Sequence, residues 1–422
     1  AQFAGRDAFA RPTTIRTGSS PAVMVPYVSR PTKLSGLRIA VDSQEPYTRA
    51  LFVANSTDAF VLEQCEVEVS GNVYPNQECA AVVLQNCGGV SARGPVLRGN
   101  RFSASCGTRE ALALSILDSS PSVLDNELVV ADWDVMGNAF GVRSKGVGLP
   151  VLERNEVLAE GSVATGIALS TPQRGVLGGS TLRAGVTGNR VGATAGSGGA
   201  VGLELAGAAE VRVERNRVAA QSYSAVAMRV RSVYAVVAAN NVLVVGTGAW
   251  DSSRLVGIEA SDAFDTTKQE IELQLVHNTV LLGRVSDYDA DEAIGIWLPD
   301  TAQPSVVNNL LFALPSIGRS YGIVEEGDRS DPVSVRNNAF VGLDVLYGDD
   351  LEGELTAAAA LDRLDGQIVG NCPSCPMDPH SRVGANAVLA SSAEELFADF
   401  AGEDGSAELL ADADLHLAAG AP

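Results

Sequence analysis

An asparagine recurs along this chain every 24 to 38 residues, and each time an apolar residue follows two places later. These asparagines are Asn100, Asn126, Asn155, Asn189, Asn216, Asn240, Asn278, Asn308 and Asn337. Their intervals are too regular for chance and too variable for a strict tandem repeat. The pattern predicts a solenoid whose coils share a core but carry loops of different lengths.

A second short motif, glycine followed by apolar-x-apolar, comes after the asparagine segment in several repeats. It begins at Gly166, Gly202, Gly257, Gly295 and Gly322. Alternating apolar residues predict strands with one buried face, and helix-period stretches are lacking before about residue 354. Each coil should therefore consist of a strand, a loop, a second strand and a turn.

Stacked coils place equivalent residues about 4.8 Å apart, so inward asparagines could bond one another in a ladder that satisfies their buried amides. The alternative is a ladder at a turn that faces water. With these repeats the chain resembles the right-handed parallel β-helix proteins of the pectate lyase and chondroitinase type, over roughly residues 20–345. The resemblance implies an architecture and leaves the activity open.

The repeat register also extends toward the N-terminus. Residues 61–67 match residues 151–157 closely, which places Cys65 where the later coils have asparagine, and a still earlier coil fits around Leu37. We therefore expect an all-β, right-handed parallel β-helix of about eleven coils over residues 36–345. Residues 1–35 should form an N-terminal cap with the first strands, and residues 346–422 a C-terminal capping region with short helices at 355–364 and 391–400.

The formal charge of -21 argues against nucleic acid and anionic membrane as partners. No run of 18 apolar residues exists, so membrane insertion is not expected. Only three of the 30 basic residues are lysine, a composition typical of GC-rich bacteria.

The even number of cysteines, six, suggests disulfides and an oxidising compartment. Cys79 and Cys106 fall in corresponding places of adjacent coils, so a disulfide between them is our first choice. A pairing of Cys65 with Cys87 follows only by elimination. Cys372 and Cys375 suit a local disulfide or two free thiols better than an incomplete zinc site.

The x position of the glycine motif should face outward, so the coils stack these residues in a column. The column contains Val83, Ala113, Arg143, Ala168, Glu204, Arg229, Glu259, Trp297 and Val324. The β-helix polysaccharide lyases and hydrolases that the chain resembles place their sites on this kind of sheet. Trp297 and Arg143 are therefore candidate ligand-binding residues.

Acidic and aromatic residues also recur in the loop before this strand. They comprise Asp132-Trp133-Asp134, Trp250-Asp251 and the run from Asp287 and Tyr288 to Glu292. Rings and carboxylates together suit a sugar-binding groove, with Trp133, Trp250, Asp251 and Tyr288 as ligand-binding candidates. Asp287, Asp289 and Asp291 are candidate calcium ligands, against the alternative of a solvated acidic loop.

An enzyme would use Glu204, Arg229 and Glu259 as its catalytic residues. The two glutamates should lie two coils apart, about 9.6 Å, near the separation in inverting glycosidases. Arg229 or Arg143 would be the base of a lyase. Glu-Arg-Glu is equally natural as a surface ion-pair ladder, and the recognisable hydrolase motifs of the family are absent.

The sequence thus favours a secreted or cell-surface protein that acts as a structural or glycan-binding module. The alternatives are a polysaccharide lyase or glycoside hydrolase and a component of a fibre or spike. No cofactor is required, with calcium the one candidate. The expected partner is a polysaccharide or cell-surface glycan, with self-assembly or attachment to a larger chain as a further option.

Overall fold

All the secondary structure described in the computed structural model is β-strand, and the strands pair mainly in parallel. The described residues are 2–4; 13–349 without 46, 72–77, 90–91, 108, 133–136, 171–181, 208–210, 232–235, 248–251, 262–272, 284–289, 300–301, 315–316, 327–329, 331 and 333; and 353–356, 382–384, 387–389, 397–399 and 414–417. The chain divides into a first unit, 1–198 with 203–212, and a second unit, 199–202 with 213–422.

Three parallel sheets, A, B and C, organise the first unit. Sheet A contains β1 (Gln2–Ala4), β4 (Thr32–Ser35), β7 (Phe60–Glu63), β10 (Val96–Arg98), β13 (Ser122–Leu124), β16 (Val151–Glu153) and β19 (Ala184–Thr187). Sheet B contains β2 (Thr13–Thr17), β5 (Leu37–Asp42), β8 (Glu66–Gly71), β11 (Arg101–Cys106), β14 (Glu127–Asp132), β17 (Glu156–Gly161) and β20 (Arg190–Ala195). Sheet C contains β3 (Val23–Val25), β6 (Thr48–Ala54), β9 (Glu78–Gln85), β12 (Glu110–Leu117), β15 (Asn138–Lys145), β18 (Val163–Ser170) and β21 (Gly199–Ala206), whose first four residues belong to the second unit.

The second unit repeats the same arrangement. Its strands in sheet A are β22 (Val211–Glu214, shared with the first unit), β25 (Val236–Ala239), β28 (Leu273–Val276), β31 (Ser305–Val307), β34 (Ser334–Arg336) and β38 (Arg382–Gly384). In sheet B they are β23 (Arg217–Ser222), β26 (Val242–Thr247), β29 (Thr279–Gly283), β32 (Leu310–Ala313), β35 (Ala339–Val341) and β39 (Ala387–Leu389). In sheet C they are β24 (Ser224–Arg231), β27 (Ser252–Ser261), β30 (Ala290–Pro299), β33 (Ser320–Glu326), β36 (Val345–Asp349) and the antiparallel β37 (Gly353–Leu355).

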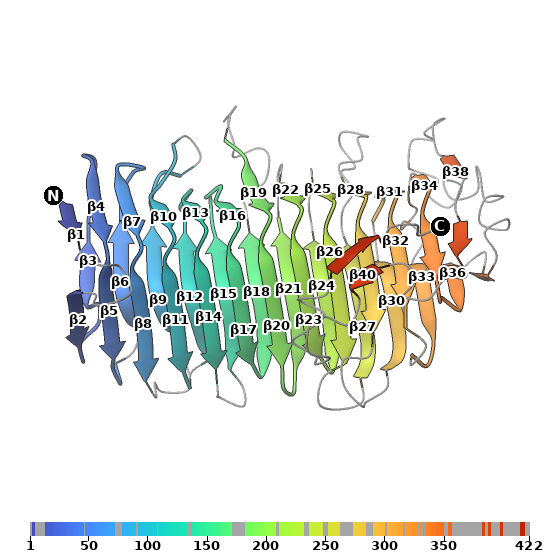
Figure 1. The fold of residues 1–422 in the computed structure, drawn as a ribbon, viewed down its shortest axis with the longest axis horizontal. Helices are drawn as coiled ribbons and strands as arrows, with labels where there is room; N and C mark the ends of the chain where they lie inside the picture. The colour runs from blue at the N-terminus through green and yellow to red at the C-terminus, as the bar shows by residue number, and fades with distance from the viewer. Residues whose placement is uncertain are drawn as a thin grey trace. The chain divides into compact units, whose positions relative to one another are not determined.

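Each coil runs from sheet A through sheet B to sheet C and so has three strands, where the sequence predicted two, and the next coil begins again in sheet A. Strands of one sheet are therefore three apart in the chain, as β8, β11, β14 and β17 show in Figure 1. Alternate residues point inward and stack in rows, such as Phe102, Leu128 and Val157, which are buried. This confirms the predicted parallel β-helix and the all-β class.

The glycine of the sheet C motif is needed because the backbone there approaches the core closely. A Cβ atom on Gly257 would lie 2.2 Å from Cγ1 of Val280 and 2.6 Å from the carbonyl oxygen of Gly295. A larger residue would have to displace the neighbouring coil. At Gly257 the motif therefore marks an inward position that has no room for a Cβ atom in this coil.

The asparagine ladder is present and buried at the corner between sheets A and B. In the first unit the backbone N–H and Nδ2 of Asn100 both donate to Oδ1 of Asn126 at 2.9 Å, and Asn126 and Asn155 repeat this with Asn155 and Asn189. The second Nδ2 hydrogen of Asn100 reaches the carbonyl of Leu62. Each amide is thus paired on both sides, as a buried polar group requires.

In the second unit the ladder shifts from three of the residues expected for it. It runs Asn216, Asn241, Asn278, Asn309 and Asn338, and the expected Asn240, Asn308 and Asn337 lie one residue earlier, outside it. These three adopt φ near +55° and lie at the surface of the corner. Asparagine tolerates this left-handed conformation, so the first of each Asn-Asn pair makes the turn and the second enters the ladder.

Cys65 occupies the ladder position of its coil, as the register predicted. Its N–H donates to Oδ1 of Asn100, and its Sγ lies 3.7 Å from the carbonyl of Leu34, where an asparagine would place Nδ2. Cys87 holds a similar corner after sheet C, where its N–H donates to Oγ of Ser119. Both thiols are free and buried, and burial raises the pKa of each. The pairing of Cys65 with Cys87 is therefore absent.

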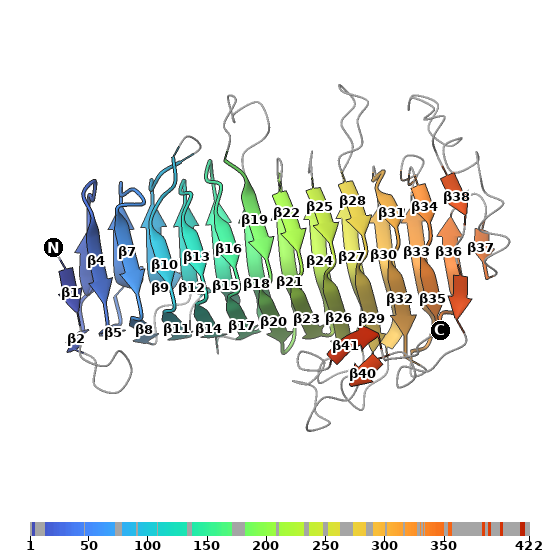
Figure 2. The same cartoon turned by 45° about the horizontal axis from the view of Figure 1, so that its top comes forward.

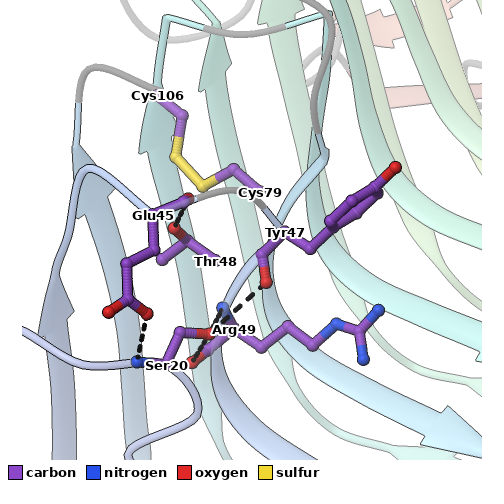
Figure 3. The surroundings of a disulfide bond; sticks show 7 residues. All are labelled: Ser20, Glu45, Tyr47, Thr48, Arg49, Cys79 and Cys106. Carbon is purple, nitrogen blue, oxygen red and sulfur yellow. Dashed lines mark hydrogen bonds between the residues drawn. A yellow bond between two sulfur atoms is a disulfide. The ribbon is translucent and has the colours of Figure 1, made fainter. Parts of the chain in front are cut away.

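The expected disulfide between Cys79 and Cys106 is confirmed (Figure 3). Cys106 ends β11, and Cys79 lies near the start of β9 beside its register partner Thr48 in β6, the preceding strand of sheet C. Thr48 Oγ1 donates to the carbonyl of Glu45 at 2.6 Å. The bond thus closes a corner between sheets B and C. Cys372 and Cys375 lie outside the described residues.

Strands of the three sheets extend on both sides of the eleven expected coils. Strands β1, β2 and β3 precede the coil of Leu37, and β38 and β39 follow the coil of Asn338. Farther along, β40 (Phe397–Asp399) and β41 (Asp414–Leu417) form an antiparallel pair. Of the helix expected at 391–400, the structure describes only 397–399, which form a strand and not a helix. Most of the helix expected at 355–364 lies outside the described residues. No membrane-spanning helix occurs in the part of the chain that the structure describes.

Candidate functional site

Three of the predicted site residues lie side by side on the outer face of sheet C in the second unit. Arg229 of β24, Glu259 of β27 and Trp297 of β30 are direct partners in the strand register. The residues before and after each point inward and are buried. The column predicted from the glycine motif is thus formed here, and Val324 of β33 continues it.

Glu259 is held by two arginines. Its Oε2 accepts a hydrogen bond from Nε of Arg229 at 2.8 Å, and its Oε1 accepts one from Nη2 of Arg231 at 2.9 Å. The Glu259 side chain is only 6% exposed, whereas that of Arg231 is 46% exposed. One carboxylate between two guanidinium groups fixes the arginines and leaves a local excess of positive charge.

Trp297 lies beside this cluster on an apolar floor. Its ring packs against the buried Val201, Val226 and Val256. The guanidinium of Arg254 lies 4.8 Å above the ring, and Nε of Arg254 donates to Glu292 at 2.6 Å. Trp297 is therefore a supporting surface for Arg254, and its indole N–H is buried without a hydrogen-bond partner in the described residues.

The first unit carries the opposite arrangement around Arg143. This side chain is 5% exposed, its Nη1 donates to Glu110 at 2.6 Å, and its Nη2 donates to Glu78 at 2.7 Å. One arginine between two carboxylates, stacked over Phe140, cannot serve as an accessible base. Arg143 is thus a buried structural cation, contrary to its expected role on an open surface.

Ala113 and Glu204 differ from the other residues of the predicted column. Ser115, and not Ala113, pairs with Val83 and Arg143, so Ser115 is the column residue of β12. Ala113 corresponds to the inward glycine of other coils, because alanine is small enough for that position. Glu204 is half-buried in β21 of the first unit and forms no ion pair with the described residues.

The acidic and aromatic loop residues are described only in part. Trp133, Trp250, Asp251, Asp287, Tyr288 and Asp289 lie outside the described residues. Asp291 is exposed in β30, and Asp132 is buried at the end of β14. Within the described ranges, no three His, Cys, Asp or Glu side chains gather as a metal site would require.

Stacking of arginine side chains on aromatic rings recurs on sheet C, and the sequence analysis did not predict it. Four arginines stack on aromatic rings there, Arg49 on Phe52, Arg143 on Phe140, Arg254 on Trp297 and Arg319 on Tyr321. Two of these pairs are three residues apart in one strand. Two consecutive residues between the arginine and the ring are buried in each of these strands, so positions three apart share the outer face, and this spacing is the signal that the sequence offered.

Comparison with known proteins assigns no family. No protein-family model, no curated protein and no solved structure matches this chain. Inferences about function therefore depend on the geometry of the outer face of sheet C.

Proposed function

We propose that the protein is a secreted or cell-surface β-helix module that binds a glycan without cleaving it. The observation that carries the proposal is the ordered cluster of Arg229, Arg231, Glu259, Arg254 and Trp297 on sheet C. Fixed planar donors beside an apolar floor match the alternating hydroxyls and C–H faces of a saccharide. The Cys79–Cys106 disulfide supports an oxidising compartment.

The state of Glu259 favours binding over catalysis. A general acid or base needs an oxygen that can reach a substrate proton or a water. Each oxygen of Glu259 instead accepts a hydrogen bond from an arginine, and the side chain is nearly buried. Glu259 is therefore suited to position Arg229 and Arg231, whose remaining N–H groups can reach a ligand.

A glycan array with and without calcium is the first test, followed by calorimetry on the glycans that bind. Trp297→Ala removes the support of Arg254 and should weaken binding at least about tenfold. Arg154→Ala is the matched control, since it removes an exposed arginine that pairs with Asp125 at the corner between sheets A and B of the first unit, and it should leave binding unchanged.

Catalysis is tested on the same glycans. Neither reducing ends nor the ultraviolet-absorbing product of β-elimination should accumulate during incubation. If either product is released, and if Glu259→Gln abolishes its release, the protein is a polysaccharide hydrolase or lyase and not a binding module. If no glycan on the array binds, the glycan-binding proposal is wrong and the structural module is the favoured alternative.

A further inference from the structure

The outer face of sheet B carries an apolar strip in the second unit. Val244, Leu281, Phe312 and Val341 are partners in the register of β26, β29, β32 and β35. They alternate with the inward rows of Leu243 and its equivalents, so they point away from the core. Yet each is at most 3% exposed. We call these four residues the apolar strip.

The equivalent strand positions in the first unit face solvent. Glu68, Ser103 and Val129 are partly exposed there, and Leu158 is 44% exposed. An outward position on sheet B is therefore accessible unless another part of the chain covers it. The burial of the apolar strip requires such a cover.

The strand pair β40–β41 lies where this cover is needed. Figures 1 and 2 both show it beside the β26, β29 and β32 end of sheet B. The segment that contains the pair, residues 391–422, has eight acidic residues and neither lysine nor arginine, and its two strands mix apolar with polar residues. Such a segment can shield an apolar surface while it keeps its own outside charged.

We propose that the apolar strip is a docking surface for the chain's own strand pair β40–β41, which acts as a removable strap. The strap is antiparallel and two-stranded, whereas the coils are parallel, so it joins the solenoid by side-chain contact and not as a further coil. Its detachment exposes a contiguous apolar surface of the kind that drives association between protein molecules.

The proposal is tested first on the full chain. Leu281→Glu with Phe312→Glu places two charges under the strap, and Leu158→Glu is the matched control at the exposed equivalent position. With strand content unchanged by circular dichroism, the double variant should be cleaved within 391–422 at least about tenfold faster than the parent, because proteolysis follows the population of the open form. The control should be cleaved at the parental rate. Equal rates for all three proteins would refute the strap.

A shortened chain, residues 1–390, gives the second measurement. It should bind a hydrophobic dye severalfold more strongly than the full chain and associate by light scattering, and added peptide 391–422 should reverse both effects. Introducing Leu281→Glu and Phe312→Glu into the shortened chain should also abolish them. A folded, monomeric 1–390 without added dye binding would overturn the proposal, and if this chain does not fold, the proteolysis of the full-length variants decides.

Discussion

At the scale of single residues, Cys65 shows what an amide contributes to the corner. Its Sγ lies where the later coils place Nδ2, near the carbonyl of Leu34 and below Asn100. A thiol is a weak hydrogen-bond donor, so the ladder stabilises this coil less than it stabilises the neighbouring coils. The buried thiol also has a raised pKa because of its burial, which keeps it neutral and unreactive.

Replacing Cys65 with asparagine should therefore stabilise the protein. The new Nδ2 can donate to the carbonyl of Leu34 and to Oδ1 of Asn100, and we expect a gain of about 0.5–1.5 kcal/mol in the free energy of unfolding. Urea unfolding measures it. Cys65→Ala, which lacks the amide, should be less stable than the parent, and a Cys65→Asn protein no more stable than Cys65→Ala would contradict the ladder geometry.

Single residues also mark where sequence reasoning reached its limit. An asparagine two places before an apolar residue defines the ladder uniquely at Asn126, because Glu127 cannot replace it. In Asn240-Asn241 either asparagine satisfies the rule, since both Val242 and Leu243 are apolar. Only the left-handed conformation of the preceding residue separates them, and Asp125, Arg154 and His277 adopt it too, so residue type does not reveal it.

At the scale of the element, the corner between sheets A and B unites a surface turn with a buried ladder. Asn240 turns the chain at the surface, and Asn241 bonds Asn278 through both its N–H and its Nδ2. The two residues are chemically identical and adjacent. Their contributions to stability should nevertheless differ widely.

Asn241→Leu should cost about 2–5 kcal/mol, because it removes the oxygen that accepts both the backbone N–H and Nδ2 of Asn216 and the Nδ2 that donates to the carbonyl of Val213 and to Oδ1 of Asn278. Asn240→Gly keeps the left-handed turn accessible and should change stability by less than about 1 kcal/mol. Chemical denaturation of both variants checks the difference. Equal losses of stability in the two variants, or a larger loss in Asn240→Gly, would indicate that Asn240 is the ladder residue, as the sequence first suggested.

Strands were more predictable than the surfaces they carry. Period-two patterning predicted the strands of sheets B and C within residues 36–345, because each inward side chain must match its neighbours above and below. It did not separate the short strands of sheet A from those of sheet B, so the coil has one strand more than expected. The row of Arg229, Glu259 and Trp297 followed from the same register. The ion pairs on sheet C did not follow, because Arg143 reaches Glu78 and Glu110 in two preceding coils, and local spacing does not encode which carboxylate an arginine selects.

At the scale of the whole molecule, the negative charge is distributed unevenly along the chain. Residues 1–50 contain seven basic and three acidic residues, whereas residues 346–422 contain fifteen acidic and two basic ones. Most of the charge of -21 thus comes from the C-terminal 77 residues. Like charges so concentrated repel one another in the folded chain.

Raising sodium chloride from about 10 mM to about 150 mM shortens the Debye length from about 30 to about 8 Å and should raise the urea midpoint. Surface ion pairs respond in the opposite direction, but each contributes about 1 kcal/mol or less. A variant with the eight acidic residues of 391–422 changed to their amides should respond less to salt. A midpoint that falls as salt is added would show that ion pairing outweighs repulsion.

The asparagine ladder also has a direction along the chain. At the steps of the ladder within each unit, the asparagine N–H and Nδ2 of one coil donate to Oδ1 of the asparagine in the coil that follows it in sequence, as from Asn100 to Asn126 and from Asn309 to Asn338. In a chain that folds from its N-terminus, each donor asparagine is therefore placed before the coil that carries its acceptor. Every newly wound coil completes the one before it, and the growing end presents an unsatisfied amide as the template for the next.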